Sequence, residues 1–303
     1  MKTLILAAGI APMISSLVFS EETPEAEMIV EEMREEFPLF DVVRGSVSQT
    51  GSMSLDGNPG DLSVRTYGMR AILSRPIDLF SGINMIPFFN YELTELNFGG
   101  TGAIPIGDED LHSVSLQALF FKNFQNTPWL AVGWTRAEFA SDYQGIGSDD
   151  FSFDLSLGLG YKFNDSFTFG LGFVVTDLNG RERFFPGINF DWKPNEKFRM
   201  GIYGPNLFAR YIFSESWFMS VDGAPSGGVW NINDDFGVSR NVQLDSYLLG
   251  LYTHHKISKR FWLTVGGGYT FANQIEIRDN GPSFSNDMDG APFFQVALSL
   301  REW

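Results

Sequence analysis

Hydrophobic and polar residues alternate with a period of two over most of the chain after residue 40. The clearest segment spans 151–163, where Phe, Leu and Tyr residues alternate with polar or small ones. After a polar turn at 164–166 the pattern resumes over 167–175. Because successive side chains of a strand point to opposite faces of a sheet, these two segments predict a tight hairpin with one apolar face. The alternation recurs in the segments 83–93, 114–120, 188–192, 261–271 and 294–300.

Many of these segments have the length of a strand that crosses a bilayer. A tilted transmembrane strand needs about 9 to 11 residues, whereas strands of soluble sheets typically have about 5 to 6. The pattern therefore favours an all-β, antiparallel, up-and-down transmembrane β-barrel.

The connections between the segments are of two kinds that broadly alternate. The short polar ones are 75–79, 123–127, 164–166, 193–197, 214–216 and 256–259. The longer ones, rich in Gly, Asn and Asp, are 56–61, 97–110, 141–149, 223–243 and 274–290. Barrels of the bacterial outer membrane have short periplasmic turns and longer outer loops. Six short turns and two periplasmic termini predict 14 strands, and the short unit around Gly204-Pro205 leaves 12 possible.

The first 38 residues differ from the rest. Lys2, a mostly apolar stretch over 3–17 and the sequence Val18-Phe19-Ser20 are typical of a cleaved export signal over 1–20. Residues 21–38 are rich in Glu and predict a short acidic helix in the periplasm, with Pro24 in its first turn. This segment could plug the barrel or bind a partner protein, but a solvated spacer is favoured. The barrel then spans 39–303.

Composition narrows the functional classes. Hydrophobic residues make up 44% and charged residues 19%, which excludes a disordered chain. The absence of cysteine excludes disulfides and thiolate chemistry. The formal charge of -16 opposes nucleic-acid binding, which needs a basic surface. Beyond the N-terminus, no apolar run has the length of about 18 residues that a membrane-spanning helix requires.

Tryptophans stand next to the short turns. Trp129, Trp217 and Trp262 lie at the start of strands that leave a short turn, and Trp192 lies just before one. Aromatic rings gather where apolar and polar solvent meet, so these four residues are predicted to form a periplasmic aromatic girdle.

Several motifs in the second half of the chain resemble an uncharacterised outer-membrane β-barrel family. They are the run FDWKPNEKF over 190–198, Gly204-Pro205, the run YIFSESW over 211–217, and the run KISKRFW over 256–262 followed by GGGY over 266–269. The resemblance implies a fold and a location in the outer membrane. Members of that family carry no assigned function, so the resemblance implies no catalytic or binding residue.

The end of the chain supports this location in part. Outer-membrane barrels are similar in presenting a last strand with a terminal aromatic residue to the barrel-assembly machinery, and Trp303 fits. However, Leu298 and Leu300 have the opposite parity, and Arg301 is in phase with Trp303. Either a bulge lies near the end or Trp303 is an interfacial residue.

The parity of each strand also predicts the residues that face the lumen. Among them, the ten lumen-facing candidates are Asn84, Asn90, Glu92, Ser113, Gln117, Asp154, Asn189, Asp191, Arg199 and Arg210. Side chains of both charge signs could select ions or small solutes in a pore. They could equally pair with one another and fill the barrel, and the sequence leaves this choice open.

Candidate chemistry is sparse. His112 is expected at the rim, and His254 and His255 precede a short turn where polar residues are ordinary. Acidic groups in the long loops, such as Asp287 and Asp289, could bind Ca²⁺, but solvated loop charge is favoured. We therefore expect no enzyme, catalytic residue, metal or cofactor.

The most favoured function is a channel or passive transport pore for small solutes. Its expected partners are outer-membrane lipid and the barrel-assembly machinery, with no nucleic acid. Three alternatives remain: a structural or adhesion barrel, a lipid-modifying enzyme within the barrel, and a secreted soluble β-sandwich lectin.

Overall fold

The computed structural model describes residues 41–301 except 81, 103, 179–180, 234–238 and 279–282. The expected signal peptide, the acidic segment over 21–38 and the terminal Trp303 lie outside the described residues, so those expectations stay predictions. Within the described part of the chain, no helix is both long enough and apolar enough to cross a membrane.

The described residues form one antiparallel sheet that closes on itself. Its strands are β1 (Val43–Thr50), β2 (Met53–Ser54), β3 (Gly60–Ile72), β4 (Ile77–Phe80), β5 (Ile83–Gly100), β6 (Glu109–Asn123), β7 (Trp129–Ser141), β8 (Phe151–Asn164), β9 (Phe167–Leu178), β10 (Arg181–Asn195), β11 (Phe198–Tyr203), β12 (Asn206–Ser214), β13 (Trp217–Asn233), β14 (Ser239–Lys256), β15 (Phe261–Arg278), β16 (Phe284–Met288) and β17 (Ala291–Leu300).

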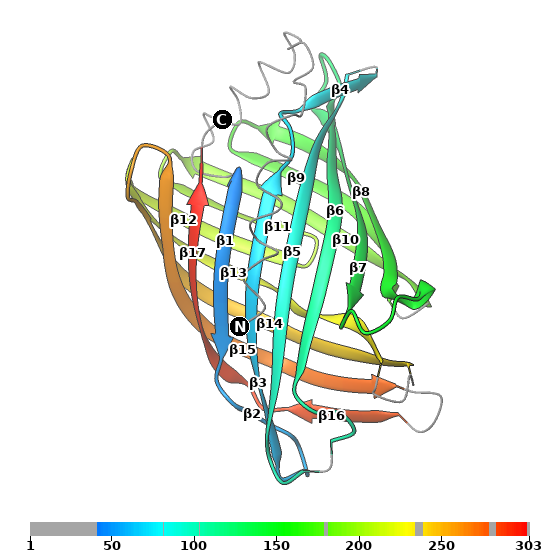
Figure 1. Cartoon of the computed structure of the whole chain (residues 1–303). Helices are drawn as coiled ribbons and strands as arrows, with labels where there is room; N and C mark the ends of the chain where they lie inside the picture. The colour runs from blue at the N-terminus through cyan, green and yellow to red at the C-terminus, as the bar shows by residue number, and fades with distance from the viewer. Residues whose placement is uncertain are drawn as a thin grey trace.

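Fourteen of these strands make the ring, and β17 pairs with β1 to close it (Figure 1). They are β1, β3, β5 to β15 and β17, and each pairs with its neighbour in the chain. The other three strands are short additions: β2 pairs with β3, β4 with β5 and β16 with β15. The predicted antiparallel barrel of 14 strands is therefore confirmed. The alternative of a β-sandwich does not hold, because a sandwich has two packed sheets and the described strands form one closed ring.

The two ends of the barrel differ. Both ends of the described chain lie at one end of the barrel, where Val43 pairs with Leu300 on one side and with Ala71 on the other. The six short turns lie at this same end, which we call the turn end and which is the upper end in Figure 1. The opposite end, where β2 and β16 lie, is called the loop end.

The outer face of the barrel is apolar around its middle. Leu157, Leu171, Leu251 and Phe294 are all exposed, while their neighbours in the chain are more enclosed, as the period of two requires. A belt of exposed apolar side chains on a closed barrel is the surface that a bilayer solvates and water does not. The apolar parity predicted from the sequence is the outward one.

Two of the predicted long loops are mostly strand, and the prediction for them is wrong. The segment 223–243 is taken up by β13 and β14 on both sides of a short connection, and 274–290 contains the end of β15 and all of β16. These strands continue beyond the apolar belt because their inner sides have a second surface to pack against.

That surface is a core of buried apolar side chains at the loop end, which we call the closing cluster. Its larger members are Met53, Leu55, Leu62, Leu96, Leu111, Trp230, Ile232, Val242, Leu244, Ile275, Ile277 and Met288. They come from β13 to β16 on one side and from the β2–β6 region on the other. The indole N–H of Trp230 donates to the Ser113 hydroxyl at 3.0 Å, which joins β13 to β6. The closing cluster therefore packs across the barrel at the loop end.

Candidate transport pathway inside the barrel

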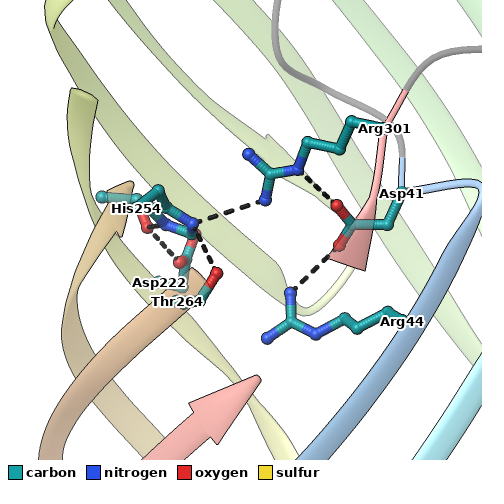
Figure 2. Close-up of polar contacts among 7 residues, drawn as sticks. Asp41, Arg44, Asp222, His254, Thr264 and Arg301 are labelled. Carbon is teal, nitrogen blue, oxygen red and sulfur yellow. Dashed lines mark hydrogen bonds and ion pairs between the residues drawn. The ribbon is translucent and has the colours of Figure 1, made fainter. Parts of the chain in front are cut away.

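A network of charged and polar side chains lies inside the barrel near the turn end (Figure 2). Asp41, just before β1, accepts hydrogen bonds from Arg301 at 2.5 Å and from Arg44 at 3.3 Å. Arg301 lies directly after β17, so this pairing ties the two ends of the described chain together across the seam of the barrel. Burial raises the pKa of Asp41, but the charges of Arg301 and Arg44 outweigh that effect and hold the pKa below its ordinary value.

The same network continues to His254 on β14. Its Nδ1 lies 2.9 Å from the Thr264 hydroxyl and 3.4 Å from an Arg301 nitrogen. Its Nε2 lies 3.0 Å from the Ser220 hydroxyl, and Ser220 donates to Asp222 at 2.6 Å. His254 also stacks on Phe218 with ring centroids 4.0 Å apart. The imidazole is therefore held on every side by neighbouring groups.

Positive charge exceeds negative charge on the part of the inner wall that β1, β3, β12 and the end of β17 form near the turn end. Arg44 and Arg70 are direct partners in the β1–β3 register, and Arg210 on β12 and Arg301 add two more guanidinium groups. Among the described residues, Arg70 has no ion pair and lies 4.6 Å from the Phe88 ring centre. The carboxylates of Asp41 and Asp222 oppose the charge of Arg210, and Asp41 also pairs with Arg301. We call this the basic wall.

The opposite sign dominates on β5, β7 and β8. Asp154 accepts hydrogen bonds from Arg136 at 2.6 Å and from Thr176, and Arg136 also pairs with Glu138 at 3.3 Å. Glu92 accepts a hydrogen bond from Thr94 at 3.3 Å and has no ion pair among the described residues. Three carboxylates face one guanidinium group here, which makes this the acidic wall.

Between the closing cluster and the network lies a cavity of about 260 Å³. Its lining includes eight hydroxyl side chains, namely Ser46, Ser48, Thr50, Thr66, Thr94, Ser226, Ser246 and Thr270. Glu92 and Gln295 also border it, and Met53, Val64, Leu244, Leu248 and Pro225 supply its apolar part. The lining offers hydrogen-bond donors and acceptors together with a smaller apolar surface, which suits small neutral molecules.

Among the ten predicted lumen residues, the structure pairs Asp191 with Arg199, and several of the others contact polar residues outside that set. Asp191 and Arg199 form a bidentate ion pair, and the Tyr203 hydroxyl also donates to the Asp191 carboxylate. Asn90 and Gln117 both donate to Ser115, at 3.4 and 3.2 Å. These contacts give the residues a structural role, and their part in transport stays a prediction.

The remaining candidates differ in their surroundings. Asn84 is buried, and its Oδ1 has no hydrogen-bond partner among the described residues. Asn189 accepts a hydrogen bond from the Gly204 N–H at 2.8 Å, which anchors the β11–β12 turn. Arg210 lies 5.4 Å from the Phe208 ring centre, and its Nη1 has no partner in the described part of the chain.

One member of the predicted aromatic girdle is placed wrongly. Trp129, Trp192 and Trp217 are exposed at the turn end, so a place in the interface stays their predicted role. Trp262 is only 1% exposed and lies inside the barrel, with the Arg301 guanidinium 5.0 Å from its ring centre. Its parity is opposite to that of outward Phe261 and Leu263, so the alternation itself indicated the inner face.

The Ser220–His254 contact lacks the features of a hydrolase. A catalytic histidine takes up the serine proton and is oriented by a carboxylate on its other nitrogen. Here that other nitrogen faces Thr264 and the cation Arg301, so a proton gained by His254 would add positive charge beside Arg301. Among the described residues, no group of three His, Asp or Glu side chains is arranged to hold a metal ion.

Several polar residues of the barrel interior were not predicted. They are Asp41, Arg44, Arg70, His254 and Arg301, together with the hydroxyl groups of β1. The available signal was the alternation at Arg44, Ser46, Ser48 and Thr50, which places polar residues on one face of β1.

Comparisons with known proteins give one matching family and several solved structures. The family model described as Domain of unknown function (DUF6268) matches residues 89–301. No curated protein matches the chain. The chain is similar to the COG4313 outer membrane channel from Pseudomonas putida F1, with 11% identity, a TM-score of 0.46, and coverage of 85% of this chain and 94% of that one. It is also similar to the KdgM porin, with 8% identity, a TM-score of 0.33, and coverage of 85% and 99%.

Proposed function

The chain belongs to the family described as a domain of unknown function (DUF6268), and we propose that it is a passive transport channel for small solutes in the bacterial outer membrane. The observation that carries this proposal is the cavity of about 260 Å³ within the barrel. In a barrel with a purely structural role, inward side chains would be expected to fill the interior. A space bordered by hydroxyl groups can instead hold a solute and replace the hydrogen bonds that it makes with water.

The charges of the interior support the same proposal. The basic wall lies near the turn end and the acidic wall lies farther from it on other strands, so the two walls together create a field inside the barrel. Such a field orients a dipolar solute, and the near balance of signs limits selectivity between anions and cations. The three carboxylates of the acidic wall and the four guanidinium groups of the basic wall are retained inside an apolar belt, which is costly unless they interact with one another, with water or with a solute.

The proposed surroundings follow from the outer surface. The apolar belt requires membrane lipid, and assembly into the outer membrane would use the barrel-assembly machinery through β17. The function needs no cofactor and no catalytic residue.

Uptake of arabinose by vesicles that contain the purified protein tests the proposal. Swelling of these vesicles should be faster than that of protein-free vesicles. Ser48→Trp should slow swelling several-fold, because Ser48 lines the cavity and the indole would fill it. Val47→Trp is the matched control, since Val47 is the exposed neighbour on the same strand and should leave the rate unchanged. A folded barrel with no uptake of any small solute would instead favour the structural or adhesion alternative.

A further inference from the structure

The wall of the barrel is interrupted beside the cavity. Strands β11 and β12 have only 6 and 9 residues, whereas the flanking β10 and β13 have 15 and 17. They join at Gly204, whose positive φ of 59° suits a tight turn and whose N–H is bound by Asn189. The hairpin therefore ends well before its neighbours do.

Beyond the Gly204 tip of this hairpin, toward the loop end, two strand edges have no lateral partner among the described residues. β11 pairs with β10 only over 189–195, so residues 181–188 of β10 pair with β9 alone. β12 pairs with β13 only up to Gly223, so the part of β13 from Ala224 onward pairs with β14 alone, apart from one bridge between Asn231 and Ser141 of β7. The four strands can be followed in Figure 1. An interruption of the hydrogen-bonded ladder thus lies between β10 and β13.

The residues on these edges suit an opening. Each edge carries a proline, Pro186 on β10 and Pro225 on β13, and proline is confined to strand edges and bulges because it lacks an N–H. The consecutive residues Phe184 and Phe185 are 66% and 47% exposed although they point to opposite faces. This part of β10 is therefore uncovered on its inner face as well as on its outer face.

β13 bends away from β10 at this level and crosses toward β7. Gly227 has a φ of 103°, and a Cβ there would lie 2.0 Å from the Leu244 carbonyl oxygen, so only glycine fits the bend. The bend leads Trp230 into the closing cluster and Asn231 to its bridge with β7. The strand segment that closes the loop end is therefore the same one that leaves the side of the barrel unpaired.

The interruption borders the cavity directly. Pro225, Ser226 and Gly227 line the cavity and belong to the unpaired edge of β13. Pro225 pairs with Tyr247, which is exposed at the loop-end limit of the apolar belt, next to the exposed Asp245. The gap therefore faces the membrane interface at the loop end, which belongs to the outer leaflet when the short turns lie in the periplasm.

We propose that solutes enter the cavity sideways, through the gap between β10 and β13, and that this entrance admits small uncharged amphiphiles with a hydroxyl head group. The proposal rests on the transport function proposed above. The closing cluster obstructs the axial route at the loop end, while the gap joins the cavity to the zone where amphiphiles collect. The hydroxyl lining and Gln295 bind the head group, Leu244, Leu248 and Pro225 contact the apolar body, and the Glu92 carboxylate repels anions.

Fluorescence quenching by nitroxide-labelled lipid tests whether the gap is open to the bilayer. The chain has no cysteine, so the single substitutions Ser226→Cys, Ser48→Cys and Leu249→Cys each allow a bimane label to be attached at one site, with no labelling elsewhere. Leu249 faces outward, whereas Ser48 lines the cavity on a strand paired on both sides. We expect label at Ser226 to be quenched at least half as strongly as label at Leu249, and label at Ser48 to be protected. Equal protection at Ser226 and Ser48 would overturn the proposal.

Lengthening the short hairpin tests whether the gap is the entrance. Thr-Val inserted before Gly204 and Val-Thr inserted after Pro205 would extend the ladder with β10 and β13. In the barrel with the original hairpin, 1-octanol should change the emission of bimane at Ser48, and this change should be lost in the lengthened variant. Arabinose uptake by the unlabelled lengthened variant should fall several-fold. The same four residues inserted at Ile146, in the loop between β7 and β8, are the control and should change neither. If uptake persists in the lengthened variant, the proposal that solutes enter through the gap is wrong while the transport function stands. If neither the original nor the lengthened barrel takes up solute, the transport function is wrong, and the quenching result still decides whether the gap is open.

Discussion

At the scale of single residues, the interior of the barrel is organised by guanidinium groups. Arg301 contacts Asp41, His254 and the ring of Trp262, so one side chain joins the seam of the barrel to β14 and β15. Because Arg301 is largely enclosed, the loss of its carboxylate partner leaves a poorly solvated charge. The stability of the seam therefore depends on the ionisation of Asp41.

The first prediction concerns pH. The pKa of Asp41 in the folded barrel lies below its ordinary value of 3.8, so the folded state favours the ionised carboxylate. The stabilisation is fully present above the unfolded pKa, near 3.8, and is lost as the pH falls through the lower folded value. We expect the free energy of unfolding, measured by urea titration in lipid vesicles, to decrease over this acidic range.

Substitution isolates the contribution of this carboxylate. Asp41→Asn should reduce the free energy of unfolding at neutral pH by about 3 kcal/mol and flatten its acid dependence. Asp149→Asn, at an exposed carboxylate in the loop before β8, is the control and should do neither. An unchanged acid dependence in the Asp41 variant would show that another group is responsible.

At the scale of strands, the period of two determines which solvent each side chain meets. On β8, Leu157 faces outward and is 43% exposed, whereas its neighbour Ser156 points to the interior, as does Asp154. The same alternation continues across the hairpin to β9, where Leu171 is exposed. A charge therefore has a different cost on adjacent residues of one strand.

The second prediction uses this difference. Leu157→Arg should make folding into vesicles less favourable by about 2 to 4 kcal/mol, because the residue lies near the middle of β8 and the charge would face hydrocarbon. Ser156→Arg should cost less, since the interior contains water and polar groups. Equal losses for the two variants would contradict the assignment of the outer face.

At the scale of the whole molecule, the ring is asymmetric from end to end. The turn end has short connections and both ends of the described chain, while the loop end is closed by buried apolar side chains. Outer-membrane barrels place their short turns in the periplasm. The closing cluster would then lie on the cell exterior, which is where a channel has to exclude unwanted solutes.

The third prediction tests this orientation. Ile146→Cys, in the exposed loop between β7 and β8, should react on intact cells with a maleimide that does not cross membranes. Glu196→Cys, in the short turn between β10 and β11, should react only after the outer membrane is permeabilised. Labelling in the reverse order would invert the barrel.

The sequence by itself determined the fold class, the outward face and the polar character of the interior, and it favoured 14 strands while leaving 12 possible. These properties depend on local geometry, because a pleated strand exposes every second side chain to the same surroundings. The parity of β5, β6 and β8 was therefore enough to select Glu92, Gln117 and Asp154 as inward residues. It also carried the information that Trp262 points inward, although its place beside a short turn suggested the girdle.

Only the tertiary structure decided which inward residues meet. Trp230 and Ser113 are 117 positions apart, and Asp41 and Arg301 are 260 positions apart, yet each pair forms a hydrogen bond. Such contacts depend on the curvature of the whole ring and on the bend of β13 at Gly227, which no periodic pattern encodes. The closing cluster, the two charged walls and the gap beyond the tip of the β11–β12 hairpin arise in this way, because each is a relation between strands that are distant in the chain.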